Sequence, residues 1–341
     1  MNFWEKLNKP FFVLAPMADV TDQAFRRIIA KYSRHGEVKG GPDVFWTEFV
    51  SADGLMSPGR EVLRHDLAFT QGERPIAAQL FGSHPDKMEG AARLCAEMGF
   101  DGIDINMGCP DKSIEKQGAG ASMMKNPERA VEIIRAAKRG APNLPISVKT
   151  RIGYNKNEIA TWIPQLLEED IAVLTLHCRT RKEMSKVPAR WEHVREVVEL
   201  RNKLGSKTLI IGNGDVKTIQ EARIKIQETG CDGVMLGRAI FGNPWLFDQS
   251  RGEIPLEEKL QVMVEHTKLY EELFGLNRTE STVDRTGKPV LGGIKSFAIM
   301  KKHYKAYVHG FPGALELREK LMACENAKDV ENTVSNWLLT K

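Results

Sequence analysis

One cysteine in this chain of 341 residues stands where a thiol could do chemistry. Cys109 comes just after the run Gly102–Met107 and lies between Gly108 and Pro110. The run is typical of a buried parallel strand, and the glycine and the proline would shape the turn that follows it. Because a neutral thiol is available at pH 7 and can give up a proton, we interpret Cys109 as a candidate general acid.

The remaining cysteines have no such surroundings. Cys95 falls on the apolar side of a predicted helix, and Cys178, Cys231 and Cys324 have no neighbours that favour reactivity. A cysteine is more often a small buried hydrophobic residue than a reactive one. Five scattered cysteines without a pair at metal-ligand spacing predict reduced thiols, no bound metal and a cytoplasmic protein.

Short β-rich runs alternate with helical patterns from residue 11 to about residue 250. We expect eight strands, at Phe11–Ala15, Val44–Phe49, Ile76–Phe81, Gly102–Met107, Ile146–Arg151, Val173–Arg179, Leu209–Asn213 and Val234–Gly237. Most of these runs are almost continuously apolar, as expected for parallel strands covered on both faces. Eight β/α units favour an α/β fold of the TIM (β/α)8 barrel type over a doubly wound sheet, which usually has fewer strands and a glycine-rich first turn.

The β-rich pattern disappears after about residue 253, and the rest of the chain has helical periodicity. Helices are expected at Leu256–Leu273, Ile294–Val308, Ala314–Cys324 and Asp329–Leu339, with a loop at Thr279–Gly293. We therefore predict a barrel domain at residues 1–250, followed by a smaller all-α helical-bundle domain at residues 251–341.

Active sites of TIM barrels lie at the carboxyl ends of the strands, so polar residues and glycines there are the candidates for chemistry. The predicted strand ends carry Pro16, Met17, Gln79, Asn106, Lys149, Arg151, His177, Arg179, Asn213, Gly214, Asp215, Gly237 and Arg238. Buried polar groups are costly unless a ligand or one another satisfies them. The set therefore predicts either a ligand site or a network of polar residues that pair with each other.

Two groups of these residues predict two parts of one ligand. Gly212–Asp215 and Leu236–Ala239 resemble a phosphate site of this fold, with close backbone N–H groups and one guanidinium. Lys149 would place a cation near an anionic ring, and Gln79 and Asn106 can hydrogen-bond the edge of a heterocycle. A phosphate together with a hydrogen-bonded planar ring describes flavin mononucleotide (FMN).

The overall composition allows a nucleic-acid partner without requiring one. Hydrophobic residues make up 42% of the chain and charged residues 28%, and the net charge is +4, a mild excess of positive charge. No apolar run approaches the roughly 20 residues that a membrane span needs. The first residues lack the basic-then-apolar pattern of a signal peptide. We therefore expect no membrane association.

Nine segments, spread over nearly the whole chain, make it resemble the tRNA-dihydrouridine synthases. They are Ala15–Asp22, Thr47–Ala52, Gln79–Gly82, Asp104–Pro110, Gly118–Ala121, Val148–Gly153, Leu176–Arg181, Gly212–Asp215 and Gly237–Trp245. The combination of Asn-Met-Gly-Cys-Pro with the later Gly-Asn-Gly-Asp and Gly-Arg-Ala is highly specific. Met300–Tyr304, Tyr307 and Gly310–Gly313 also resemble the helical tRNA-binding domain of that family.

The resemblance implies an FMN-dependent enzyme that reduces uridines in tRNA to 5,6-dihydrouridine, with NADPH or NADH as the electron donor. It implies that reduced flavin delivers hydride to carbon six of the uracil ring while Cys109 protonates carbon five. The flavin would be held by Pro16, Met17, Ala18, Gln79, Lys149, His177, Asn213, Gly214, Asp215, Gly237 and Arg238. Asn106, Arg151 and Arg179 would contact the uracil or the flavin, and the base must be single-stranded or extruded to reach them.

One loop departs from the pattern of the family. After Arg181 many members carry Tyr-x-Gly-x-Ala-x-Trp, whereas residues 182–191 of this chain read Lys-Glu-Met-Ser-Lys-Val-Pro-Ala-Arg-Trp. The alanine and the tryptophan are kept, but the tyrosine and the glycine are replaced. Since the loop lies near the predicted substrate mouth, its departure leaves open which tRNA uridine is chosen and leaves the predicted chemistry unchanged.

A basic stretch lies in the predicted helical domain. Residues 285–305 hold six basic residues and no acid, namely Arg285, Lys288, Lys295, Lys301, Lys302 and Lys305. Such a run is usually only a solvated face, but the aromatic residues Phe297, Tyr304 and Tyr307 interleave with it. We therefore predict that the last four of these basic residues form a surface that binds the phosphate backbone of tRNA. A monomer is expected.

Three other functions fit parts of these observations. A flavin oxidoreductase acting on a free small molecule would share the barrel site, but it would not need a basic helical domain. A tRNA-binding protein without catalysis would need neither Cys109 nor the polar strand ends. An aldolase with Lys149 as its Schiff base would not call for Gln79 and Asn106. FMN-dependent reduction of tRNA uridine accounts for all of these residues together.

Overall fold

The computed structural model describes residues 2–275, 281–283, 289–291 and 294–340. The chain forms two compact units, and each unit consists of two separate segments of the chain. The first unit holds Met1–Ala18 and Gly41–Arg238, and the second holds Asp19–Gly40 and Ala239–Lys341. The domain boundary predicted at residue 250 stays a prediction, and the compact units differ from it by placing residues 19–40 and 239–250 with the C-terminal helices.

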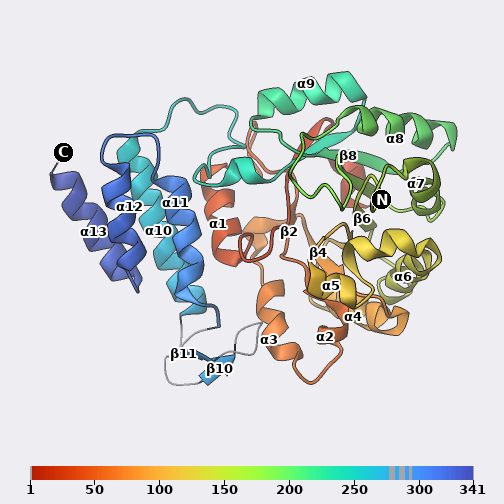
Figure 1. Ribbon diagram of the computed structural model, residues 1–341, viewed down its shortest axis with the longest axis horizontal. Coiled ribbons are helices and arrows are strands. Elements are labelled where there is room, and N and C mark those ends of the chain that lie inside the picture. Colours follow the sequence, from red (N-terminus) through yellow and green to blue (C-terminus); the bar gives the residue numbers. More distant parts are fainter. Residues whose placement is uncertain (1, 276–280, 284–288, 292–293, 341) are drawn as a thin grey trace. The chain divides into compact units, whose positions relative to one another are not determined.

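The first unit is built around one parallel sheet that curves into a barrel (Figure 1). Its strands are β1 (Phe11–Leu14), β2 (Phe45–Trp46), β3 (Val50–Ser51), β4 (Ile76–Phe81), β5 (Gly102–Met107), β6 (Ile146–Arg151), β7 (Val173–His177), β8 (Leu209–Asn213) and β9 (Gly233–Leu236). They pair in the order β1-β9-β8-β7-β6-β5-β4-β2, and β3 also pairs with β4. The predicted TIM barrel is confirmed.

The edges of this sheet, β1 and β2, meet through Asp43. The Asp43 backbone N–H donates to the Phe12 carbonyl oxygen at 2.8 Å, and the Phe12 N–H donates to Asp43 Oδ2 at 2.6 Å. The predicted second strand, Val44–Phe49, is wrong in its extent, because the structure has β2 and β3 in its place. Thr47 interrupts the ladder there, since its hydroxyl accepts the Gln79 backbone N–H at 3.1 Å.

Both faces of the barrel strands are buried, which explains their nearly continuous apolar sequences. The helices of this unit are α2 (Ala52–Leu55), α3 (Arg60–Arg64), α4 (Pro85–Glu97), α5 (Lys112–Lys116), α6 (Pro127–Gly140), α7 (Ile159–Leu167), α8 (Glu192–Lys203) and α9 (Ile219–Thr229). Proline opens both α4 and α6, and the Asn126 side chain caps α6 by accepting the Arg129 N–H at 3.2 Å. Gly230, with φ 71°, ends α9.

Aromatic residues fill the amino-terminal end of the barrel. Trp4, in the 3-10 helix Phe3–Lys6, is 2% exposed and packs against Phe11 and Trp46, with ring centroids 5.7 and 5.8 Å away. These rings belong to a core cluster with Val13, Ala77, Val173, Ile211 and Met235. Since bulky side chains occupy this end, the carboxyl end of the strands is where polar side chains can gather.

The second unit is helical, as predicted. It contains α1 (Gln23–Tyr32), α10 (Leu256–Phe274), α11 (Met300–Tyr307), α12 (Ala314–Ala323) and α13 (Ala327–Leu339). Buried side chains from all of these helices form one apolar core, and the last four lie side by side in Figure 1. The loop expected at Thr279–Gly293 is wrong in part, because β10 (Ser281–Val283) and β11 (Pro289–Leu291) pair there as antiparallel strands. Arg285 and Lys288 lie outside the described residues.

Helices α4 and α6 approach each other at Gly140. A Cβ atom at Gly140 would lie 2.1 Å from the Glu89 carbonyl oxygen and 2.9 Å from Ala92 Cβ. Gly140→Ala should therefore lower the free energy of unfolding by about 1–3 kcal/mol, the usual cost of overpacking. The measurement is the urea-unfolding midpoint. Gly252→Ala is the control, because a Cβ there meets nothing within 4 Å; equal midpoints for the two variants would contradict the packing argument.

Candidate active site

Parallel strand register places the predicted polar residues next to each other. Asn106 on β5 pairs with Lys149 on β6, and Arg151 pairs with His177 on β7, which pairs in turn with Asn213 on β8. Pro16, Met17, Ala18, Gly237 and Arg238 follow directly after β1 and β9, which are neighbours. All these residues belong to the first unit. The structure therefore brings the predicted set to one end of the barrel, while the role of each residue stays a prediction.

A chain of hydrogen bonds leads from the barrel interior to Cys109. Gln79 Nε2 donates to Asp104 Oδ2 at 2.6 Å, and Asn106 Nδ2 donates to Gln79 Oε1 at 3.0 Å. Asn106 Oδ1 then accepts the backbone N–H of Gly108 at 3.1 Å and of Cys109 at 2.9 Å. The alternative considered above, that polar residues pair with one another, thus holds in part for Gln79 and Asn106.

The carboxyl group of Asp104 is buried at the start of this chain. Asp104 is 1% exposed, and its Oδ1 accepts the Ser147 hydroxyl at 2.6 Å. Burial raises the pKa of Asp104 to about 6, although hydrogen bonds from Ser147 and Gln79 and the charge of Lys149 act in the opposite direction. Sequence reasoning missed Asp104 as a site residue, because a lone acid inside an apolar run has no motif of its own.

The thiol of Cys109 lies in an apolar wall of the site. It is partly buried and packs against the cluster of Phe81, Ile114 and Ala119. Burial raises the pKa of the thiol, and the negative charge of Asp111 adds to this. A hydrogen bond from the Asp111 backbone and the positive charges of Arg151 and Lys149 lower the pKa and offset the rise only in part. The thiol is therefore protonated at neutral pH, which is the state that a general acid requires.

Glycines beside Cys109 allow close backbone approach. A Cβ at Gly108 would lie 3.3 Å from the Thr150 backbone, tighter than an ordinary contact. At Gly120, with φ +60°, a Cβ would lie 2.8 Å from the Cys109 carbonyl oxygen. Gly108 does not have a positive φ, so its backbone adopts a conformation that other residues could also adopt. A glycine is needed at this position because the loop packs closely against β6.

Lys149 is a partly buried ammonium group with few partners. Its Nζ donates one hydrogen bond among the described residues, to Asn213 Oδ1 at 3.3 Å. Burial, with the nearby charge of Arg151, lowers the pKa of Lys149 to about 8. Two of its N–H bonds therefore remain available for an anionic or carbonyl group in the barrel mouth.

His177, Arg179, Asp215 and Arg238 form an ionic network. Asp215 accepts a hydrogen bond from the Arg179 guanidinium and another from Arg238 at 2.6 Å. Partial burial raises the pKa of Asp215, but the hydrogen bonds and charges of the arginines outweigh it, so the pKa is below its ordinary value. Arg179 Nη1 also lies 3.1 Å from His177 Nε2. Burial, with four surrounding cations, lowers the pKa of His177, so its ring is neutral and Nε2 accepts from Arg179.

The turn after β8 has the backbone shape of an anion site. Gly214 has φ 139° and Asp215 has φ 59°, and the Trp191 indole N–H donates to the Gly214 carbonyl oxygen at 2.9 Å. The backbone N–H groups of Gly214, Asp215, Gly237 and Arg238 donate to no group in the part of the chain that the structure describes. Such paired turns with free N–H groups suit phosphate.

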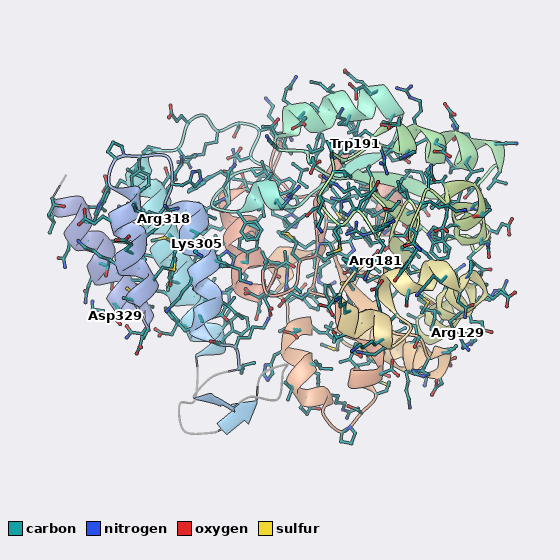
Figure 2. The ribbon with its side chains drawn as sticks, viewed as in Figure 1. Arg129, Arg181, Trp191, Lys305, Arg318 and Asp329 are labelled. Atoms are coloured by element: carbon teal, nitrogen blue, oxygen red, sulfur yellow. The ribbon has the colours of Figure 1, made fainter. Side chains whose placement is uncertain are left out.

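Trp191 is a site residue whose packing the sequence did not reveal. A Cβ at Gly212 would lie 2.2 Å from its ring, so the glycine lets the indole lie flat against β8. Arg181 precedes the loop that departs from the family pattern, and Trp191 is its last residue; both are labelled in Figure 2. Within this loop Glu183 pairs with Arg190 at 2.8 Å. The loop is thus braced without the family's tyrosine and glycine.

Arg151 and Arg179, predicted to contact substrate, have most of their donors engaged with the protein. Arg151 Nε donates to the Gly108 carbonyl oxygen at 2.8 Å, and its Nη1 donates to the Thr180 and Met184 carbonyl oxygens. Arg179 Nε donates to the Val187 carbonyl oxygen at 2.6 Å. Both arginines therefore position the loops around Cys109 and residues 180–191, and their substrate contact stays a prediction.

The predicted tRNA surface is changed by the structure in one respect. Tyr304 and Tyr307 are 0% and 2% exposed and lie in the helical core, so the idea that they interleave with the basic residues on a surface is wrong. Their three-residue spacing places both rings on one face of α11, and that face packs into the core formed with the other helices of the unit. Lys305 is exposed on α11 (Figure 2), and Lys301 is partly exposed. Lys302 Nζ donates to the Asp19 carbonyl oxygen at 2.6 Å.

Lys295 completes that basic set. Its ammonium lies 5.3 Å from the centre of the Phe274 ring, as a cation–π contact on the same unit. Lys295 is partly exposed. The four lysines thus differ in how free their charges are: Lys302 is held by the Asp19 carbonyl oxygen, whereas Lys301 and Lys305 have no side-chain partner among the described residues.

The structure also bears on metals, membranes and other cavities. Among the described residues no group of three or more His, Cys, Asp or Glu side chains could hold a metal ion. No described helix is long and apolar enough to cross a membrane. A cleft of about 930 Å³, lined by Trp4, Lys9, Pro145 and Lys207 among others, lies at the amino-terminal ends of β6, β7 and β8, away from the predicted site residues.

A parallel barrel with a partly buried cation, a protonated thiol and free backbone N–H groups at its strand ends belongs to the class of TIM-barrel enzymes. The sequence profile described as "Dihydrouridine synthase (Dus)" matches residues 13–340. A protein named "Probable tRNA-dihydrouridine synthase" from Staphylococcus aureus (strain MRSA252) is 39% identical over 323 residues, which cover 94% of this chain and 91% of that protein.

A second relative supports the same assignment. "Probable tRNA-dihydrouridine synthase 2" from Bacillus subtilis (strain 168) is 39% identical over 338 residues, which cover 98% of this chain and 96% of that protein. The chain therefore belongs to the dihydrouridine synthase family, and it is an oxidoreductase.

The raised pKa of Cys109 predicts how this thiol reacts with an alkylating agent. Only the thiolate reacts, so the rate of iodoacetamide alkylation should rise with a midpoint above that of a free cysteine. The measurement is the labelled fraction by mass spectrometry between pH 6 and pH 11, with N-acetylcysteine as the reference. Cys109→Ser should leave the native protein almost unlabelled, because the other four cysteines are buried. A midpoint at or below the reference would show that the thiol is activated as a nucleophile.

Proposed function

We propose that this chain is an FMN-dependent enzyme that reduces uridine in tRNA to 5,6-dihydrouridine, with NADPH or NADH as the electron donor. The observation that carries the proposal is that Lys149, with two free N–H bonds in the barrel mouth, stands opposite Asn106, which holds the loop of the protonated Cys109. Family membership supports the reaction, and a reducing cytoplasm agrees with five free cysteines.

The residues present fit FMN. The free N–H groups of Gly214, Asp215, Gly237 and Arg238 suit its phosphate, and the Arg238 guanidinium, 68% exposed at its side chain, can turn toward the same group. Lys149 suits the electron-rich edge of its ring. His177, Asn213, Pro16, Met17, Ala18 and Gln79 would line the rest of the site. When bound and reduced by NADPH or NADH, FMN would supply the hydride.

The protein's own part in the reaction is to hold a proton and to place the base. Burial keeps Cys109 protonated, and Asn106 fixes its backbone through the N–H bonds of Gly108 and Cys109. A proton passed from Cys109 Sγ to carbon five of the uracil ring leaves a thiolate, which the charges of Arg151 and Lys149 stabilise. The proposed role of Cys109 is thus that of general acid.

The proposed substrate requires room for an extruded base. Arg151 links the loop at residues 180–191 to the Cys109 loop, because it donates hydrogen bonds to the Gly108 and the Met184 carbonyl oxygens. Asn106, Arg151 and Arg179 are the proposed contacts to the uracil or the flavin. In the second unit, Lys295, Lys301, Lys302 and Lys305 are the proposed tRNA contacts, of which Lys301 and Lys305 have the freest charges.

Removing the thiol should separate binding from chemistry. Cys109→Ala should keep the FMN absorption band near roughly 450 nm and should still bind tRNA. Its formation of dihydrouridine should fall by about 10²–10⁴-fold, the usual contribution of a general acid. Reconstituted proteins are compared by absorption spectroscopy, by tRNA binding and by mass spectrometry of digested tRNA.

Three outcomes would contradict the proposal. A wild-type protein without a flavin band after reconstitution would exclude the FMN site, and wild-type turnover in Cys109→Ala would exclude the general acid. A wild-type enzyme that reduces free uracil derivatives but leaves tRNA unchanged would support instead a flavin oxidoreductase of small molecules.

Charge reversal tests the proposed tRNA surface. The double variant Lys301→Glu/Lys305→Glu should weaken tRNA binding, and the slope of log affinity against log salt should become less steep by about 1 to 2. The control is Lys320→Glu/Lys328→Glu, which makes the same charge change at lysines already paired with Glu316 and Glu331. Equal binding by both double variants would move the tRNA surface away from α11.

A further inference from the structure

We infer that Asp104 is a positioning residue, whose carboxyl group orients the Gln79 amide and through it holds Asn106 and the backbone of the Cys109 loop. The inference about the loop stands on the geometry of this chain alone. Its consequence for the cofactor rests on the proposed function, because Gln79 is proposed there to line the FMN site.

The direction of the hydrogen-bond chain follows from the chemistry of its two ends. An ionised carboxylate only accepts hydrogen bonds, so Gln79 must turn its NH2 group toward Asp104, at 2.6 Å. The Gln79 oxygen then faces Asn106 Nδ2 at 3.0 Å. At the far end the backbone N–H groups of Gly108 and Cys109 only donate, so they require the Asn106 oxygen. The acceptor at Asp104 and the N–H donors of the Cys109 loop therefore require the same orientation of the Gln79 and Asn106 amides.

Burial makes this orientation matter. Gln79 is 0% exposed and Asn106 is 7% exposed, so water does not replace a lost partner easily. Without an acceptor at position 104, the Gln79 NH2 group loses its partner and the amide is free to rotate. If the Gln79 amide rotates, its NH2 group can face the Asn106 NH2 group, so that a donor lies where Asn106 had an acceptor. The Cys109 backbone N–H then loses its fixed acceptor, Asn106 Oδ1.

Burying the carboxyl group of Asp104 costs folding free energy. Burial raises the pKa of its carboxyl group, which means that the folded protein disfavours the charged form. An apolar side chain of similar shape would avoid that cost. Asp104 supplies two acceptors that an apolar residue lacks, one for Gln79 and one for Ser147. Ser147 has a second acceptor in the Ile103 carbonyl oxygen, and only the bond from Gln79 leads on to the Cys109 loop.

Two variants of similar shape separate the acceptor from the charge. In Asp104→Asn, the amide oxygen can still accept from Gln79 while its NH2 group donates to Ser147 Oγ. Ser147 can then donate to the Ile103 carbonyl oxygen, which lies 3.3 Å away. In Asp104→Leu no acceptor remains. If position 104 required only a side chain of this size, the two variants would behave alike.

The first experiment needs no cofactor. In apo protein at pH 8, iodoacetamide should alkylate Cys109 at least about fivefold faster in Asp104→Leu than in wild type, the factor expected when one net hydrogen bond holding the loop is lost. Asp104→Asn should stay within about twofold of wild type, because the acceptor is kept. Gln79→Leu should match Asp104→Leu, and the double variant should add little, since both act through one chain.

The outcomes of this experiment are decisive in both directions. Equal alkylation rates in wild type, Asp104→Leu and Asp104→Asn would overturn the inference, and so would fully additive effects of Asp104→Leu and Gln79→Leu. Thermal unfolding of each variant is measured alongside. If Asp104→Leu fails to fold, Gln79→Leu and Asp104→Asn still decide the question, because the chain predicts loosening in the first and retention in the second.

A second measurement extends the inference to the cofactor. FMN affinity, from quenching of flavin fluorescence, should fall at least about fivefold in Asp104→Leu. Wild type that fails to bind FMN would contradict the proposed function while the alkylation result still tests Asp104. Wild type that binds FMN, with unchanged affinity in Asp104→Leu, would instead overturn the positioning of Gln79 toward the cofactor.

Discussion

The parallel register of the barrel strands is the constraint on which the site depends. Residues that are far apart in the sequence, such as Asn106, Lys149 and Asn213, become neighbours because their strands run in one direction and end at one rim. A shift of one residue in any strand would turn its polar side chain to the opposite face. At the other end of the barrel the rings of Trp4, Phe11 and Trp46 pack together in an apolar cluster.

Burial then decides the charge of each group at the rim. The same loss of water that lowers the pKa of Lys149 raises the pKa of Asp104 and of Cys109, because in each case the charged form is disfavoured. Asp215 is the exception, since two arginines stabilise its charge. The result is a protonated thiol beside cations that can accept the negative charge it would leave behind, an arrangement that suits a proton donor better than a nucleophile.

Arginines act mainly as braces around this rim. Arg151 joins the Cys109 loop to the loop at residues 180–191, and Arg179 joins that loop to the turn after β8. The guanidinium group suits this task because its donors point in fixed directions toward several carbonyl oxygens at once. The loop that differs from the family pattern is therefore held both by its own Glu183–Arg190 pair and by contacts from Arg151 and Arg179 outside it.

The sequence by itself determined the architecture and the membership of the site. Apolar runs at regular spacing predict eight strands and the helical second unit, and the polar strand ends name most of the side chains that meet at the rim. These signals are local, since each depends on residues close together in the chain. Only the tertiary structure decided which polar groups are partners and which are free. Asp104 and Trp191 act through contacts across strands, and Tyr304 and Tyr307 turn inward because of the helices packed against α11. Such contacts join residues distant in sequence, so no local pattern records them.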